Sequence, residues 1–125
     1  MDIDQFVTTA EEQTTREFNW GTINWLDSAE LTGTGSLTVG EVTIYRGEQN
    51  TEHYHPNCDE SLYLLSGELE HSIGSEARTL TPGDLIHIPA GDRHQATSTG
   101  SEDAIAVIVY DTGERDVEFV DADSE

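Results

Sequence analysis

The amino-acid sequence predicts an all-β protein that folds as one β-sandwich or β-barrel. Short strand-like runs follow one another from residue 37 onward, and Gly, Pro and Ser residues separate them. Many short strands with turn residues at this spacing are typical of a sandwich or a closed barrel. A chain of 125 residues has room for one hydrophobic core, so we expect a single domain. The runs are LTVGEVTIYR, TEHYH, ESLYLLS, ELEHSIG, EARTL, DLIHIP, HQATS and AIAVIVYD.

The two ends of the chain are expected to lie outside the β-domain. We expect an N-terminal arm over residues 1–17, the β-domain over 18–120, and a disordered acidic tail over 121–125. Within the arm we expect one short helical turn in residues 8–17, because Thr8 and Glu11 have the spacing of a capping box.

The β-pattern begins directly after the arm. Phe18 with Trp20, and then Ile23 with Trp25, alternate along the chain, which predicts a half-buried strand or arm. These side chains either pack in the core or line a ligand pocket, and core packing is the reading that we prefer. The glycine-containing segment ELTGTGS that follows has turn composition.

Ser66 and Gly67 separate two strand-like runs, which predicts a hairpin with a two-residue turn. The expected pairs are Leu64 with Leu69, Leu62 with His71, and Glu60 with Ile73. Period-two alternation places all six side chains on one face, and their apolar company indicates that this face is the interior. Glu60 therefore points into an apolar interior, where a carboxylate is costly unless a positive charge meets it.

The charge balance excludes several classes of function. The chain carries 26 acidic residues, five arginines and no lysine, with a net charge of −21. A nucleic-acid-binding protein needs a basic surface, and an anionic membrane face would repel this chain. Carboxylates spread along a lysine-free sequence resemble an adaptation to concentrated salt, which screens their repulsion. We therefore expect a halophile-like protein whose fold loosens at low salt.

The location of the protein is inferred from what the sequence lacks. No apolar run is long enough to cross a bilayer, and the first residues have neither the positive flank nor the apolar core of a secretory signal. Cys58 is the single cysteine and has no partner for an intramolecular disulfide. We expect a cytoplasmic protein.

A set of metal-ligand side chains stands out within this β-pattern. His53 and His55 lie two residues apart in an extended segment, so both imidazoles project to the same side. The loop PNCD then returns the chain so that Glu60 can face them. Two nitrogens and one oxygen converging in a dry interior are donors for a first-row transition metal. A fourth ligand is expected from another strand, and His94, after a glycine-containing turn, is the natural candidate.

These residues resemble the two sequence motifs of the cupin family. Residues 47–67 match the first motif, G-x5-H-x-H-x4-E-x6-G, at every fixed position. Residues 83–98 resemble the second, G-x5-P-x-G-x2-H-x3-N, except that Ser98 stands in place of the final Asn. The resemblance implies a small single-domain protein with one antiparallel barrel in jelly-roll order. It also implies one metal ion held by His53, His55, Glu60 and His94.

The donor set limits the metal without identifying it. Mn, Fe, Ni, Cu and Zn all accept nitrogen and oxygen donors, so the expectation is one divalent transition-metal ion. Three neutral imidazoles and one carboxylate leave such an ion with net positive charge, and octahedral geometry leaves two adjacent positions open. Open positions suit a Lewis-acid or redox centre that takes a bidentate oxygen ligand, or a substrate together with O2.

Two readings of the function follow. The first is a metal-dependent enzyme acting on a small oxygen-rich molecule, either a dioxygenase or an isomerase or lyase on a sugar- or enol-type substrate. The alternative is a non-catalytic module that binds or senses a small molecule. His71, across the expected hairpin from Leu62, is the candidate general base, although a buried structural histidine explains it equally well.

Three further side chains lie near the motif residues in the sequence or alternate with apolar ones. Among the five arginines, Arg46, beside Gly47, is the best placed by sequence to meet an anionic substrate, and alternation leaves its facing open. Cys58 lies in the loop between ligands and is expected to be a plain loop residue rather than a ligand or reactive thiol. His87 alternates with Ile86 and Ile88 and is expected to be structural or exposed.

The run AIAVIVY at 104–110 bears on assembly. It carries apolar side chains on both faces, whereas a strand with one solvated face alternates. We therefore expect one face to meet a second copy of the chain in a homodimer.

Overall fold

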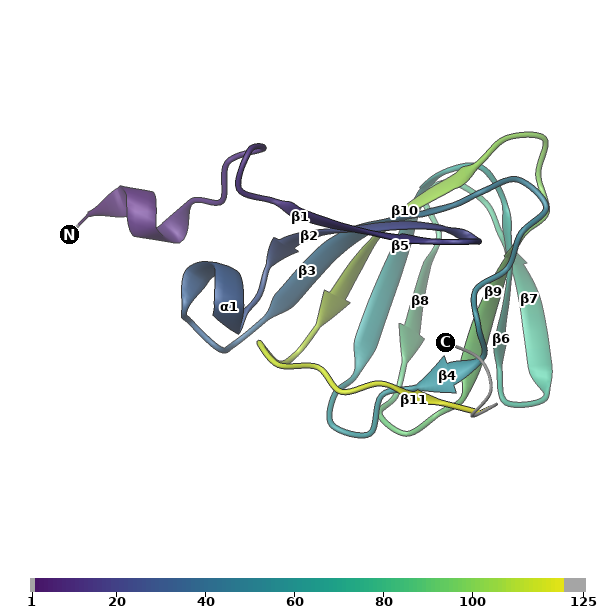
Figure 1. The fold of residues 1–125 in the computed structure, drawn as a ribbon. Helices are drawn as coiled ribbons and strands as arrows, with labels where there is room; N and C mark the ends of the chain where they lie inside the picture. The colour runs from purple at the N-terminus through teal and green to yellow at the C-terminus, as the bar shows by residue number, and fades with distance from the viewer. Residues whose placement is uncertain (1, 121–125) are drawn as a thin grey trace.

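The computed structural model describes residues 2–120 as two antiparallel β-sheets that face each other, which confirms the all-β expectation (Figure 1). The six-stranded sheet has the order β1 (Thr14–Phe18), β2 (Gly21–Asp27), β3 (Thr38–Ile44), β10 (Ala104–Tyr110), β5 (Glu60–Ser66) and β8 (Leu85–Ile88). The five-stranded sheet has the order β11 (Glu118–Phe119), β4 (His53–Tyr54), β9 (His94–Ser98), β6 (Leu69–Ile73) and β7 (Glu76–Leu80). Because chain neighbours often lie in different sheets, the chain crosses repeatedly between them in jelly-roll order.

The strand predictions agree closely with the structure. Every strand-like run contains a strand, and β5, β7 and β9 have the predicted bounds. In β3, β5 and β10, alternate side chains are buried because one face of each strand packs against the opposite sheet. The expected tail, residues 121–125, lies outside the described residues.

The N-terminal segment differs from its prediction. A short 3-10 helix, η1 (Ile3–Phe6), is followed by a turn in which the Glu12 carboxylate accepts from the Thr9 backbone N–H at 3.1 Å and from its hydroxyl at 2.9 Å. The capping pair therefore lies one residue later than Thr8 and Glu11. Residues 8–17 contain a single hydrogen-bonded turn, in which the Glu12 backbone N–H donates to the Thr9 carbonyl at 3.0 Å, and no helix. From Thr14 onward, pairing with β2 draws the chain into β1.

One short helix interrupts the β-structure between β2 and β3. This helix, α1 (Ala29–Thr32), begins where the Ser28 hydroxyl accepts from the Leu31 backbone N–H, and it ends at Gly33 with φ of 77°. The segment expected to be pure turn therefore contains one helical turn. Within residues 2–120, no helix has the length and apolar character needed to span a bilayer.

The predicted hairpin at Ser66 and Gly67 is wrong. β5 pairs with β8 and β10, whereas β6 pairs with β7 and β9, so the two strands belong to different sheets. Gly67, with φ of 82°, turns the chain from one sheet to the other, close to the backbone that enters β10. The side chains still point into the interior, as expected, because Glu60, Leu62 and Leu64 of β5 and Leu69 and His71 of β6 are all buried. They meet across the interior and not along one sheet.

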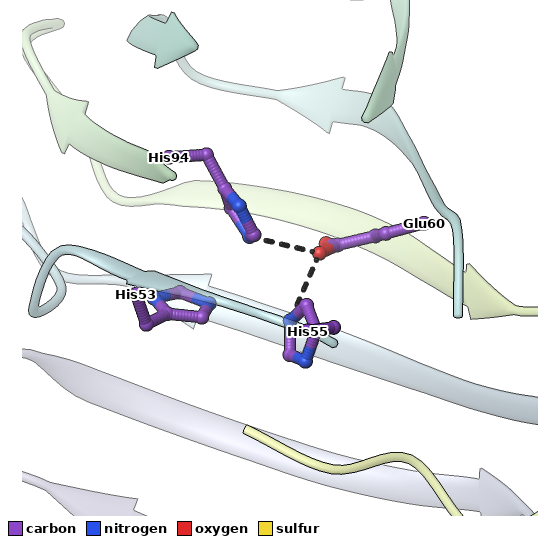
Figure 2. Close-up of side chains that lie close together, drawn as sticks. All are labelled: His53, His55, Glu60 and His94. Atoms are coloured by element: carbon purple, nitrogen blue, oxygen red, sulfur yellow. Dashed lines mark ion pairs between the residues drawn. The ribbon is translucent and has the colours of Figure 1, made fainter. Parts of the chain in front are cut away.

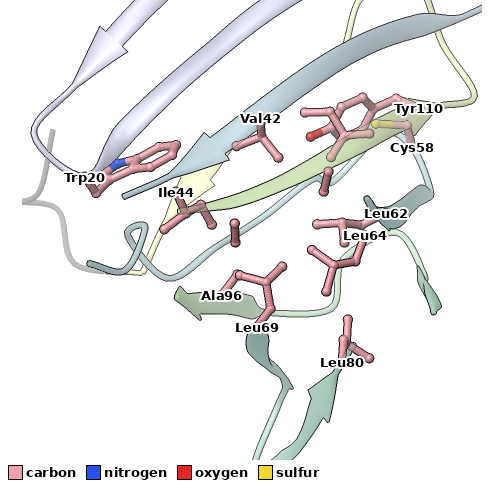
Figure 3. Packing of buried hydrophobic residues seen from close by; sticks show 13 residues of the cluster. Trp20, Val42, Ile44, Cys58, Leu62, Leu64, Leu69, Leu80, Ala96 and Tyr110 are labelled. Atoms are coloured by element: carbon pink, nitrogen blue, oxygen red, sulfur yellow. The ribbon is translucent and has the colours of Figure 1, made fainter. Parts of the chain in front are cut away.

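The hydrophobic core lies between the two sheets (Figure 3). Trp20 is buried there, and Phe18, Ile23 and Trp25 pack against the core as partly buried neighbours. The expectation of core packing for these four side chains is therefore correct, and Phe18, Trp20 and Ile23 also line a cavity described below. The remaining buried members are Val42, Ile44, Cys58, Leu62, Leu64, Leu69, Leu80, Ala96, Ala104, Ala106, Ile108 and Tyr110.

Strand β10 lies in the middle of its sheet, between β3 and β5. Its alternate residues face the core, and its other side chains, Ile105, Val107 and Val109, are only half-buried on the outer face. Tyr63 and Leu65 on the neighbouring β5 are exposed. The apolar outer face thus exists, and the homodimer stays a prediction that light scattering in concentrated salt would check.

Gly67→Ala should destabilise the fold strongly. A Cβ at this position would lie 2.6 Å from the Asp103 carbonyl oxygen and 2.7 Å from the Ala104 Cα, in addition to the positive φ. Strained backbone and overpacking each cost roughly 1–3 kcal/mol, so we expect a loss of about 2 kcal/mol or more in urea unfolding.

Gly74→Ala is the matched control, because Gly74 also has positive φ, of 60°, but no atom lies within 4 Å of its built Cβ. Its loss should be clearly smaller. Equal losses for the two variants would show that the close approach at Gly67 contributes nothing.

Candidate metal centre

Four polar side chains converge between the two sheets. His53 and His55 come from β4 and the residue after it, and His94 begins β9, where it is the antiparallel partner of His53. Glu60 begins β5 in the opposite sheet, so it faces the histidines across the interior (Figure 2). One nitrogen or oxygen atom from each of the four lies within 4.8 Å of the others. The structure therefore brings together the four side chains selected from the sequence.

The backbone fixes the protonation of each imidazole. The Nδ1 atoms of His53, His55 and His94 lie 2.6, 2.7 and 3.0 Å from the carbonyl oxygens of Thr51, Asp116 and Asp92, respectively. A carbonyl oxygen can only accept a hydrogen bond, so each Nδ1 must carry the proton and donate it. Each neutral ring then presents an unprotonated Nε2 with a free lone pair, which is the form that binds metals.

The atoms that converge lack hydrogen-bond partners. Among the described residues, the Nε2 atoms of His55 and His94 and the Oε1 atom of Glu60 are buried and unpartnered. Oε1 of Glu60 lies 3.4 Å from Nε2 of His55 and 3.1 Å from Nε2 of His94 (Figure 2). With both Nδ1 atoms protonated, these contacts set lone pairs against a carboxylate, and only a positive charge between them makes the arrangement favourable. Three imidazole nitrogens and one carboxylate oxygen fit a single divalent transition-metal ion.

The pKa shifts in the cluster reflect the same demand for positive charge. Burial alone would raise the pKa of Glu60, but its contacts with His55 and His94 outweigh burial and lower it. Burial alone would lower the pKa of His94, but the Glu60 carboxylate outweighs burial and raises it. The carboxylate thus favours positive charge at the position of the His94 Nε2. The pKa of His53 falls to about 4, mainly through burial and then through the charge of His94.

His71 lies beside the cluster and does not belong to the four converging side chains. Its ring stacks on that of His94, with centroids 6.0 Å apart. Both rings line a cavity beside the cluster, which is described below. Its Nδ1 lies 3.1 Å from the Ser72 carbonyl oxygen, so this ring also carries its proton on Nδ1 and leaves Nε2 free. Burial lowers the pKa of His71 to about 4, which keeps the ring neutral at neutral pH.

A segment that the sequence analysis overlooked completes the support of the ligands. Asp116, whose carbonyl holds His55, is itself fixed because its backbone N–H donates to the Asn57 side-chain oxygen at 2.8 Å. The Asn57 amide group donates in turn to the Glu114 carbonyl at 2.8 Å. Phe119, in β11, packs near the His53 ring with centroids 6.2 Å apart. The alternation of Arg115, Val117 and Phe119 could have indicated a strand with one face on the cavity. No residue nearby in the sequence connects this segment with the histidines.

A cavity of about 170 Å³ opens beside the cluster. Glu60, His53, His71 and His94 lie on its wall, and aromatic side chains such as Phe18 and Trp20 form much of the rest. Arg46, which the sequence favoured for binding an anion, is exposed and does not line this cavity. The sequence left the facing of this side chain open. The arginines that do line the cavity are Arg16 and Arg115.

The remaining sequence candidates have structural roles. Cys58 is buried in the core beside Tyr110, and burial raises the pKa of its thiol to about 11, which is unfavourable for a reactive thiolate (Figure 3). His87 is exposed, as expected. It lies 3.2 Å from the Ser61 hydroxyl and 3.0 Å from the Asp59 carboxylate. This serine–histidine–aspartate contact lies outside the cavity and ties the loop before β5 to β8.

Comparison with known proteins identifies relatives of the chain. It is 33% identical over 75 residues, 60% of its length, to the tetracenomycin polyketide synthase protein TcmJ of Streptomyces glaucescens. It is 33% identical over 49 residues, 39% of its length, to quercetin 2,3-dioxygenase of Bacillus subtilis. The chain spans 50% of the length of the first relative and 14% of the second.

Solved structures show the same fold. Oxalate decarboxylase of Lactobacillus farciminis, in its formate complex, superposes with a TM-score of 0.81 over 88% of this chain and 34% of its own, at 19% identity. That identity supports the fold alone. Residues 40–110, more than half of the chain, also match the family described as "Cupin domain". The chain therefore belongs to the cupin family.

Proposed function

We propose that this cupin is a mononuclear metal-dependent enzyme that acts on a small oxygen-rich molecule. One observation carries the proposal. His55 and His94 donate through Nδ1 to backbone carbonyls and turn unprotonated Nε2 atoms toward the Glu60 carboxylate. His53, whose Nδ1 is held by a backbone carbonyl in the same way, lies with them in the cluster. No arrangement of neutral hydrogen bonds satisfies these buried atoms, whereas a divalent ion would satisfy all of them. We assign the four side chains as the ligands of this ion.

A metal ion bound there supplies Lewis acidity or redox chemistry toward an oxygen ligand. The residues of this chain contribute the surroundings in which that chemistry occurs. The two sheets bury the ligands and exclude bulk water, while the carbonyls of Thr51, Asp92 and Asp116 keep the imidazoles in the required tautomer. The cavity beside the cluster holds the substrate against the exposed edge of the ligand set.

His71 is the proposed general base. Its Nε2 is free because the Nδ1 proton is held by the Ser72 carbonyl, and the ring is neutral at neutral pH. A neutral imidazole on the wall of the cavity can accept a proton from an enol, a hydroxyl or a carbon next to a carbonyl group. Tyr110 also lines the cavity, but burial raises its pKa well above the usual value, so its phenol stays protonated.

One relative supports a reaction type. The relative named as a quercetin 2,3-dioxygenase supports insertion of O2, whereas the oxalate decarboxylase resembles this chain in fold alone. Because the chain matches only part of the dioxygenase, lysis and isomerisation through an enediolate stay beside O2 insertion as reactions to be assayed.

A non-catalytic binding or sensing module is the second candidate. It is favoured by the composition of the cavity wall, where His71 is the one imidazole or carboxylate outside the proposed ligand set among the described residues. Such a module would retain a small molecule without converting it. If a stoichiometric mixture of the protein and the small molecule yields a chemically altered product, the protein is an enzyme and not a binding module.

Glu60→Gln should weaken metal binding severely, because it removes the one negative charge among the four side chains while keeping their volume. We expect chelator-stripped wild-type protein to take up one equivalent of Zn²⁺ in calorimetry and Glu60→Gln to bind at least about 100-fold more weakly. Glu70→Gln is the matched control, since Glu70 is exposed on β6. Unchanged affinity in Glu60→Gln would remove Glu60 from the ligand set.

Metal affinity should rise with pH and then level off. The metal competes with the proton that Glu60 stabilises on His94, whose pKa lies above its ordinary value of 6.5. Protonation of His53 interferes only toward its pKa of about 4. Zn²⁺ titrations between about pH 5.5 and about pH 8 should therefore show increasing affinity up to the His94 pKa and little change above it. Affinity independent of pH over this interval contradicts the assignment of His94.

His71→Gln should separate catalysis from metal binding. Because His71 is not among the ligands, we expect metal affinity to stay within about threefold of wild type. Turnover should fall by about 100-fold or more in panels of sugar acids and enols, assayed with and without O2. His87→Gln, which changes an exposed histidine, should leave both properties unchanged. Full turnover in His71→Gln would exclude His71 as the base.

A further inference from the structure

Charge is distributed unevenly between the surface and the cavity. Of the 26 acidic residues, Glu60 alone lies on the described wall of the cavity, whereas two of the five arginines, Arg16 and Arg115, lie there. With neutral histidines, the formal charge of the wall is positive even before a divalent ion is added. In a chain whose net charge is −21, this places a local anion-attracting region beside the metal centre.

Arg115 is the more deeply placed of the two arginines. It is half-buried, and its guanidinium carbon lies 4.5 Å from the centroid of the Trp25 ring and 5.2 Å from that of Tyr110. Within residues 2–120, no carboxylate oxygen lies within 4.0 Å of its guanidinium nitrogens, and its side chain donates no hydrogen bond. The rings thus hold the guanidinium in place while its donors stay uncommitted.

The chain also links Arg115 to the ligand set. Arg115, Val117 and Phe119 line the cavity, whereas the intervening Asp116 uses its carbonyl to hold His55. The Tyr110 ring, which contacts the guanidinium, lies 4.9 Å from the His55 ring, centroid to centroid. A single aromatic ring therefore separates the guanidinium from a metal ligand, and both are held by the same short segment.

The cavity is the right size for one ring. Its volume of about 170 Å³ is close to that of an engineered apolar cavity, roughly 150 Å³, that binds benzene. Phe18, Trp20, Ile23 and Phe119 give it an apolar wall. The wall therefore combines three features: a metal centre, an apolar lining and an unpaired guanidinium.

We propose that the cavity takes a ring-sized carboxylate whose oxygens at one end meet the metal centre and whose carboxylate meets Arg115. Arg115 is then the residue that selects an anionic ligand over its neutral analogue, through charge-assisted hydrogen bonds. Arg16, exposed at the rim over the Phe18 ring at 5.0 Å, attracts the anion before it enters. The inference rests on the proposed metal function of the same cavity.

The probes for the test are 3,4-dihydroxybenzoate and 3,4-dihydroxybenzamide. Both offer two neighbouring hydroxyl groups to the metal on the same ring, and they differ in the charge at the opposite side. Calorimetry with zinc-loaded protein under argon avoids oxidation of the probes. We expect the benzoate to bind about tenfold or more tightly than the benzamide.

Arg115→Gln should abolish this preference by weakening the benzoate and leaving the benzamide within about twofold of wild type. Arg46→Gln, which changes an exposed arginine outside the cavity, should keep the full preference. Zinc content is measured first in each protein. If the wild type does not hold zinc, both the proposed function and the inference fail.

If zinc is held but the wild type does not prefer the benzoate, the inference alone is overturned, and this result needs no variant to fold. A preference that persists in Arg115→Gln also overturns it, because the carboxylate would then be recognised elsewhere, including by the metal itself. Loss of preference in Arg46→Gln would indicate attraction by overall charge and would equally contradict a role specific to Arg115.

Discussion

A buried carboxylate that faces imidazole lone pairs is the constraint on which the rest of the structure depends. Glu60 is 5% exposed and has two Nε2 atoms within 3.4 Å of its Oε1. The imidazoles cannot rotate away, because backbone carbonyls from separate parts of the chain hold the opposite ring nitrogens. Left without positive charge, this cluster would oppose folding. The packing of the two sheets keeps the cluster in place. Because the cluster is unfavourable without positive charge, the interior is selective for a cation.

The same constraint explains how charge is organised in the molecule. Acidic side chains cover a surface that repels anions at long range, and arginine is scarce. Inside, neutral histidines and two arginines give the cavity the opposite character. Binding an anionic molecule here depends on interactions at close range, where desolvation and directed hydrogen bonds are strong, and salt screens the distant repulsion. Surface and cavity thus meet different requirements within one small domain.

The strands and the four converging side chains could be predicted because their signals are local. Alternation along β3, β5 and β10 and the spacing of His53, His55 and Glu60 depend on residues close together in the chain. The choice of sheet is not local. β5 and β6 read as a hairpin, yet the close approach of Gly67 to the start of β10 separates them. Arg115 was overlooked for the same reason: its stacking on Trp25 joins positions far apart in sequence, whereas Arg46 was favoured only for its nearness to Gly47.

The hydrogen bond between His55 and Asp116 spans 61 residues and has a consequence for the order of events during synthesis. All four histidine and glutamate side chains of the cluster leave the ribosome before Asp116 does, since His94 is the last of them. The nascent chain therefore exposes these donors before it can orient His55. Assembly of the centre coincides with docking of the segment around Asp116 onto Asn57, so capture of an ion marks a domain whose two sheets have already closed.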